Sequence, residues 1–222
     1  MLVPAMTLED IRREIEKELP IVQRKGAYVS HKLQRVLADR SRRQKVVRCF
    51  DYQSKFKNSW IYKIEFTKKE AAITFLIYYY GDRGLTAVCP IENDTLVYCT
   101  GHFFNRYNER KKLNLIRPND IMRSFLEATP DFKFQNLTQI NPGIFETFVV
   151  IDGGIALGTF YQQYRLYKLN TFIAADMMRH DQRELEAQVT TACLFKDELK
   201  EIQSLLPDLR GVSGWNRESL FR

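Results

Sequence analysis

The chain has 222 residues, 45% of them hydrophobic and 27% charged, and its formal net charge is +7. These proportions are typical of a globular protein and argue against a disordered chain. The longest apolar run, from Ala71 to Tyr80, is far shorter than the roughly 20 residues with which a helix crosses a membrane. We therefore expect a soluble protein without a membrane partner, and the basic surplus favours a polyanionic partner such as nucleic acid.

The four cysteines, Cys49, Cys89, Cys99 and Cys193, are scattered and form no Cys-x-x-Cys pair. Three of them lie in apolar strand-like runs, where a free thiol behaves as a small buried hydrophobe. Only three histidines are present to complete a zinc site. Residues 1–6 show no charged segment followed by the apolar run of a secretory signal. We expect a reduced, cytoplasmic protein that uses no metal and no cofactor.

The first 44 residues predict a helical arm made of two helices. In the first helix, Leu8, Ile11, Ile15 and Leu19 recur at helical spacing, and Pro20 ends or kinks the run.

The second helix of this arm is expected over residues 27–44, after Gly26. Its polar side is strongly basic, and Asp39 is the only acid among the bases. Such a side is either a solvated helix face or a surface that meets phosphate groups. The residues that we assign to a nucleic-acid contact are Lys32, Arg35, Arg40, Arg42 and Arg43.

From residue 45 the hydrophobic period changes to two, which marks the start of a predicted core domain over residues 45–206. Trp60, Tyr62, Ile64 and Phe66 point to one side of a strand. The runs that predict an antiparallel meander are 46–50, 60–67, 72–80, 85–89 and 96–100.

After this meander the sequence predicts a second group of strands. Pro118 begins a helix, and Asp131 to Pro142 is typical of a loop. Three strands then follow, over residues 144–151, 155–160 and 166–174. In the last strand, the side chains predicted on one face are those of Tyr167, Leu169, Thr171 and Ile173. Those predicted on the opposite face are Leu166, Lys168, Asn170 and Phe172.

A long helix over residues 181–206 completes the core, and residues 207–222 are expected to form a weakly ordered tail. The predicted fold class is α+β: an N-terminal helical pair, two antiparallel strand groups with intervening helices, and a long C-terminal helix.

The stretch 100–113 predicts the start of a helix and holds the one grouping that suggests chemistry. At about 100° per residue, His102, Arg106 and Glu109 share one face of this helix, and an apolar side opposite them anchors it. The anchoring residues are Phe103, Phe104 and Tyr107.

Metal-independent RNA cleavage requires proton transfer and cations at the phosphate. An imidazole transfers protons near neutral pH, so His102 is the candidate acid or base. Arg106 and Arg110 are candidates to hold the phosphate, and Glu109 to orient or supply a base. The structural alternative is an ion pair between Arg106 and Glu109 on a solvated helix face.

The order of a helix with His102 and Arg106, a second helix and a strand meander resembles the barnase–EndoU–colicin–RelE class of ribonuclease toxins. The resemblance covers about residues 95–176, and only His102, Arg106 and Arg110 match positions of that class. It implies a metal-independent endoribonuclease. The chain departs from a minimal toxin domain in its helical arm and its earlier meander.

The leading prediction is a protein that binds nucleic acid, with RNA as the expected ligand, and ribonuclease activity at His102 is its sharper form. The main alternative is a non-enzymatic module that binds a protein partner through its aromatic surfaces. A third class is a small-molecule site in a sheet-lined cavity, for which the sequence shows no polar cluster.

Overall fold

The structure is a computed structural model that describes residues 1–37, 46–66, 71–81, 84–129 and 131–205, with side chains except at 35–37 and 196–205. The helices are α1 (Leu8–Leu37), α2 (Gly101–Arg110), α3 (Pro118–Ala128) and α4 (His180–Leu205), with 3-10 turns at Gln162–Tyr164 and Ala175–Met177. The strands are β1 (Val46–Gln53), β2 (Ser59–Phe66), β3 (Ala71–Gly81), β4 (Gly84–Ile91), β5 (Thr95–Cys99), β6 (Lys133–Asn141), β7 (Ile144–Ile151), β8 (Gly154–Tyr161) and β9 (Leu166–Ala174).

The described strands form one nine-stranded sheet in the order β1-β2-β3-β4-β5-β9-β8-β7-β6. Neighbouring strands are antiparallel except β5 and β9, which pair in parallel from Leu96 opposite Leu166 to Cys99 opposite Leu169. The α+β class and the two antiparallel groups are therefore confirmed, but the two groups are halves of a single sheet. Among the described residues, no helix is both long and apolar enough to cross a membrane.

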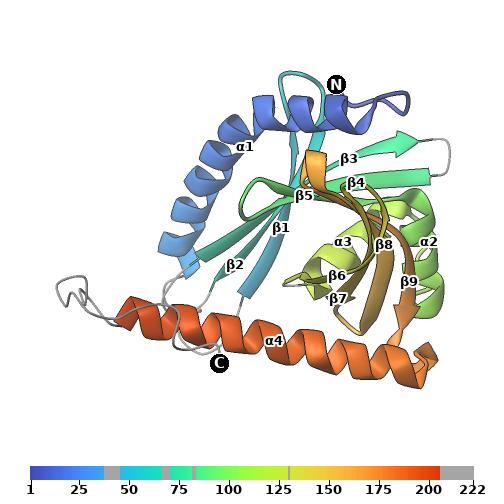
Figure 1. Ribbon diagram of the computed structural model, residues 1–222. Coiled ribbons are helices and arrows are strands. Elements are labelled where there is room, and N and C mark those ends of the chain that lie inside the picture. The colour runs from blue at the N-terminus through green and yellow to red at the C-terminus, as the bar shows by residue number, and fades with distance from the viewer. Residues whose placement is uncertain (38–45, 67–70, 82–83, 130, 206–222) are drawn as a thin grey trace.

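Helices cover both faces of the sheet (Figure 1). α2 and α3 pack on one face, where their aromatic side chains meet Ile61 of the first half and Phe172 of the second in one core. α1 covers the opposite face of the first half, around Trp60 and Ile64. α4 covers the opposite face of the second half, where Val189 packs against Phe148 and Ile155.

The predicted pair of N-terminal helices is wrong, because α1 runs unbroken from Leu8 to Leu37 with Pro20 inside it. Pro20 is exposed, and α1 bends along its length (Figure 1), as helices with an internal proline do. Gly26, which suggested a break, is buried where α1 meets β3. A Cβ there would lie 2.8 Å from the ring of Phe75, so this glycine permits close packing within a continuous helix.

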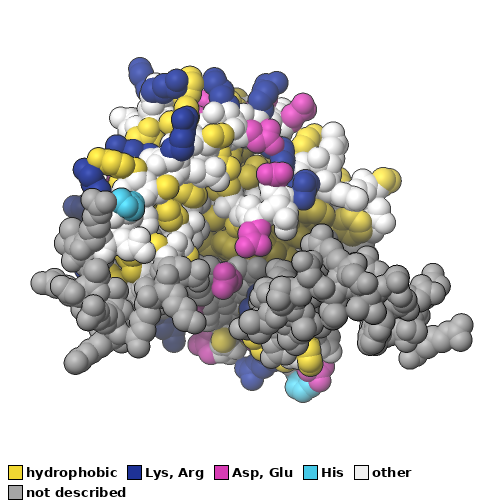
Figure 2. Space-filling model, turned by 90° about the vertical axis from the view of Figure 1, so that its left-hand side faces the viewer, with side chains coloured by type: hydrophobic (Ala, Val, Ile, Leu, Met, Phe, Trp, Pro, Cys, Tyr) yellow, Lys and Arg dark blue, Asp and Glu magenta, His cyan; other side chains and the backbone are white. Residues whose placement is uncertain are grey.

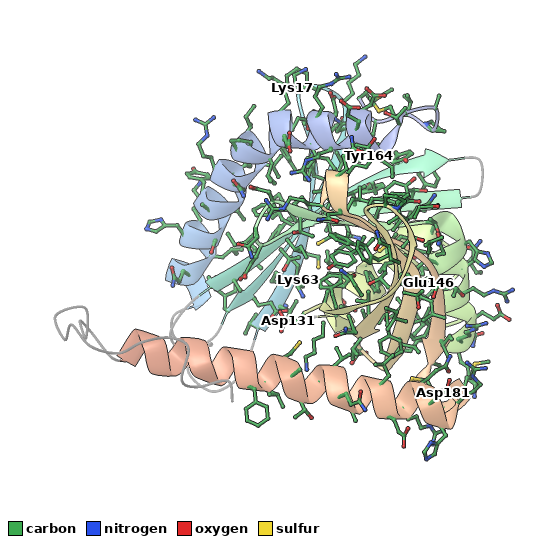
Figure 3. The ribbon with its side chains drawn as sticks, in the orientation of Figure 1. Lys17, Lys63, Asp131, Glu146, Tyr164 and Asp181 are labelled. Carbon is green, nitrogen blue, oxygen red and sulfur yellow. The ribbon has the colours of Figure 1, made fainter. Side chains whose placement is uncertain are left out.

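α1 is fixed to both halves of the sheet. The carboxylate of Glu18 is buried and accepts hydrogen bonds from Trp60 Nε1 (2.8 Å) and Asn58 Nδ2 (2.7 Å) of the first half. Arg12 donates to the carbonyl of Tyr164, which lies beside α1 (Figure 3). The helical arm thus packs directly on the core.

The predicted face of β2 is confirmed, because Trp60, Tyr62, Ile64 and Phe66 are all buried in the core beneath α1. The opposite face is covered as well. Lys63 lies there in the interior (Figure 3), with its Nζ 2.8 Å from Glu65 and 3.2 Å from the carbonyl of Thr129 at the end of α3. A buried ammonium is tolerated because these oxygens replace its hydration.

The loop predicted over 131–142 is wrong, because residues 133–141 form the edge strand β6. Only its first part reaches the core, and Leu137 and Ile140 stay exposed. Register shifts with β7 follow Asn136 and Gln139. An edge strand that buries few side chains lacks the alternation from which strands are recognised.

Candidate functional site

The first turn of α2 follows β5 directly and is fixed by Thr100. The Thr100 hydroxyl accepts a hydrogen bond from the amide of Phe103 and donates one to the carbonyl of Leu169 in β9, both at 3.2 Å. The predicted anchor is confirmed, since Phe103, Phe104 and Tyr107 are buried. This capping orients the free amides at the start of α2, which helices leave without intrahelical partners.

The outer face of α2 carries the predicted site residues, but most of them have structural partners. Arg106 Nη1 lies 2.7 Å from Glu109 Oε2, which is the ion pair of the structural alternative. Arg110 donates to the carbonyl of Phe172 in β9 and so ties α2 to the sheet. His102 is exposed and has no hydrogen-bond or ion-pair partner among the described residues. Of the four predicted residues on α2, His102 is thus the one without a partner among the described residues.

His102 borders a hollow of about 430 Å³ beside the first turn of α2, on the face of the sheet that α1 covers, where Tyr79 and Tyr98 lie. We call this cavity the α2 hollow. The polar side chains among its lining are those of Tyr79, Thr86, Tyr98, Thr100, His102, Lys168 and Asn170. Of the described residues that line it, none is acidic. The hollow therefore offers two basic side chains, hydroxyls and an amide without an opposing carboxylate.

A pair of tyrosines from the sheet lines the α2 hollow. Tyr79 of β3 and Tyr98 of β5 share a hydrogen bond, with 2.9 Å between their hydroxyl oxygens. Burial, followed by this hydrogen bond, raises the pKa of Tyr79 above its usual range. Tyr79 therefore stays neutral, and Lys168 lies beside this pair because it is opposite Tyr98 across the parallel strands.

A β-bulge in β9 lies next to the hollow. Leu157 and Gly158 are consecutive in β8, yet they pair with Thr171 and Leu169, so Asn170 is an extra residue in β9. Asn170 is exposed, lines the hollow, and its side chain has no hydrogen-bond partner among the described residues. Bulges occur often beside functional sites, where they redirect a side chain.

Because of this bulge, the predicted alternation of the strand is wrong beyond Leu169. Beyond Leu169 the faces are exchanged, and Phe172 packs in the same core as Leu169 and Tyr167 rather than opposite them. One inserted residue shifts a period of two by one position, which no alternation pattern foresees.

The predicted basic helix face is only partly described. Lys32 is exposed on α1, with its Nζ 4.7 Å from the ring centroid of Tyr28. The side chain of Arg35 and the residues Arg40, Arg42 and Arg43 lie outside the described part of the structure. Other exposed bases of α1 are Arg13, Lys17, Arg24 and Lys25. Lys and Arg side chains gather on the upper part of the face that α1 occupies (Figure 2).

No group of metal-ligating side chains occurs in the described residues. Burial raises the pKa of Cys49 to about 11 and that of Cys89 to about 12, so both thiols stay protonated at neutral pH.

Sequence reasoning missed most of the α2 hollow. The alternation placed Lys168 and Asn170 on one side of a strand, and Tyr79 and Tyr98 lie in two other predicted strands, 72–80 and 96–100. These residues converge through the pairing of β5 with β9, which brings together segments about 70 residues apart.

Comparison with known proteins finds no family model, no curated protein and no solved structure that matches this chain.

Proposed function

We propose that this protein binds single-stranded nucleic acid, with RNA as the natural ligand, and that a phosphate group is held in the α2 hollow. The observation that carries the proposal is the composition of the hollow: Lys168 and His102 line it, and no described lining residue is acidic. Cationic side chains without opposing carboxylates favour phosphate.

Two further features support a nucleic-acid ligand. The chain carries a net charge of +7, and exposed bases follow α1. Tyr79 and Tyr98 place aromatic rings beside the basic groups, and rings next to cations are the usual platform for unpaired bases. Single strands are favoured because their bases are free to stack, which is how sequence-specific RNA contacts are generally made.

Cleavage extends this proposal along the resemblance to ribonuclease toxins. His102 borders the hollow and is the proposed acid or base. Lys168 also lines the hollow and is the proposed cation that holds the phosphate. Binding is the stronger part of the proposal, because Arg106 and Arg110, assigned to phosphate, are engaged by Glu109 and by the carbonyl of Phe172.

The experiment measures the affinity of a short fluorescein-labelled single-stranded RNA by anisotropy at several salt concentrations. We expect binding to weaken steeply between about 50 mM and 200 mM salt, because phosphate contacts release counterions. Lys168→Gln should lower the affinity about tenfold and reduce the salt slope by about 1, as expected for one lost phosphate contact.

Lys55→Gln is the matched control, because Lys55 is exposed in the β1–β2 turn and is not among the residues that line the hollow. A triple variant with Arg35→Glu, Arg42→Glu and Arg43→Glu tests the basic helix separately. Absence of binding at low salt, or binding that is indifferent to both Lys168→Gln and the triple variant, would refute the proposal.

A further inference from the structure

We infer that the α2 hollow takes one terminal nucleotide by its phosphate monoester, as a free nucleoside 5′-monophosphate or as the 5′-phosphorylated end of an RNA strand. This inference rests on the proposed function and specifies which part of the nucleic acid enters the hollow.

The size of the hollow favours a single nucleotide over a continuous strand. Its volume of about 430 Å³ lies in the lower part of the range of small-ligand sites, roughly 300–1,000 Å³. Pro4 of the N-terminal segment and Gly81 at the end of β3 are also among its lining residues. The hollow is therefore bordered by the N-terminal segment, the β3–β4 end of the sheet and the first turn of α2, and its volume suits one small ligand.

The charges of the hollow match a monoester better than a diester. A phosphate monoester carries a charge of about −1.5 to −2 at neutral pH, whereas a phosphodiester in a strand carries one negative charge. Lys168 and His102 provide two basic side chains, and the first amides of α2, next to Thr100, add hydrogen-bond donors. A dianion attracts the basic side chains more strongly than a monoanion and accepts more hydrogen bonds from these donors.

The bulged Asn170 gives the hollow a group that can read the rest of a nucleotide. Its amide is both donor and acceptor, and it has no side-chain partner among the described residues. The hydroxyls of Tyr79 and Tyr98 are already shared with each other, so they form a surface for contact rather than a further anion clamp. Phosphate at the start of α2 and nucleoside toward Asn170 is the arrangement that uses all of these groups.

The experiment compares two ligand pairs on the full chain. In the first, each nucleoside 5′-monophosphate is titrated against its own nucleoside and against inorganic phosphate by calorimetry. In the second, one RNA sequence is offered with a 5′-phosphate or a 5′-hydroxyl. In both pairs we expect the monoester to bind about tenfold or more tightly, the effect of one charge-assisted hydrogen bond of about 1.5–3 kcal/mol.

Two variants link the effect to the hollow. Lys168→Gln should abolish the preference for the 5′-phosphate, and Asn170→Ala should weaken the monophosphate but not inorganic phosphate. Lys55→Gln should change neither, and unchanged melting temperatures show that each variant is folded.

The outcomes separate this inference from the proposed function. RNA that binds equally with either 5′ end, and is not displaced by monophosphates, overturns the inference and leaves RNA binding intact. If monophosphates bind and RNA does not, the inference about the α2 hollow is supported and RNA binding is overturned. If no ligand binds, both are overturned.

Discussion

At the scale of single residues, the outer face of α2 is divided by the partners that each side chain already has. Arg106 and Glu109 neutralise each other at 2.7 Å on the surface, an interaction that typically contributes only a few tenths of a kcal/mol. Arg110 bonds the carbonyl of Phe172 and therefore holds α2 on β9. His102, at the edge of the hollow, has no such role in the described residues.

This division gives the cleavage proposal a specific pattern of mutant effects. His102→Ala should lower metal-independent RNA cleavage by about 10²–10⁴, the usual contribution of one acid–base group. Arg106→Lys should leave cleavage unchanged, because Arg106 is engaged by Glu109 and is not among the residues that line the hollow. The assay incubates RNA with purified protein and a chelator from about pH 5 to about pH 9, the range around imidazole titration.

Each outcome of this assay is informative. Cleavage that survives His102→Ala would show that another group performs the chemistry. RNA that stays intact with the wild type at every pH would end the ribonuclease proposal without affecting the binding proposal.

At the scale of secondary-structure elements, the sequence predicted those whose signals are local. α2 begins at Gly101, within the stretch that predicted a helix start, α3 begins at Pro118, and α4 begins at His180, one residue before the expected start. The five strands of the first half occur where alternation and apolar runs indicated them. Caps, prolines and periodicity depend on neighbouring residues alone, so a single sequence reveals them.

The elements that were missed depend on contacts made elsewhere in the chain. Gly26 lies within α1 because α1 must approach the ring of Phe75. β6 is a strand because β7 offers it a hydrogen-bonding edge, whereas its own exposed side chains, such as Leu137 and Ile140, give no clear period. The α2 hollow depends likewise on the bulge at Asn170, which lies in a strand about 70 residues away from Tyr98.

The bulge in β9 is itself testable through the glycine opposite it. A Cβ at Gly158 would lie 2.1 Å from the carbonyl oxygen of Lys168, a backbone atom that cannot move cheaply. Gly158→Ala should therefore destabilise the protein by about 1–3 kcal/mol, the usual cost of overpacking. It should also weaken RNA binding, because Lys168 and Asn170 shift with the strand. Urea unfolding and anisotropy measure the two effects.

Gly81→Ala is the control for stability, because the nearest atom to its Cβ would be the Thr86 hydroxyl at 3.6 Å, an ordinary contact. Its unfolding free energy should change by less than about 1 kcal/mol. A Gly158→Ala protein with unchanged stability and affinity would show that the bulge does not constrain the hollow.

At the scale of the whole molecule, the parallel pairing of β5 with β9 joins two antiparallel meanders into one sheet. Each meander is recognisable from its own sequence, but nothing local specifies which of its edges meets the other. The core beneath α2 and α3 spans this junction, since it contains Ile61 and Leu76 together with Val149 and Phe172. Arg12 of α1 adds a contact to Tyr164 in the second half.

This shared core predicts that the two halves unfold together. Phe172→Ala removes a fully buried ring from the second half and should cost about 3–5 kcal/mol. Trp60 is a fluorescent probe buried in the first half, and Trp215→Phe removes the other tryptophan signal. If the halves share one transition, Phe172→Ala lowers the unfolding free energy reported by Trp60 fluorescence as much as that reported by amide exchange in β8.

Leu137→Ala, at an exposed position of β6, is the control and should change neither free energy appreciably. A Trp60 midpoint that stays in place while β8 loses protection would show two independent units, and the junction at β5 and β9 would then be a contact between domains rather than part of one core.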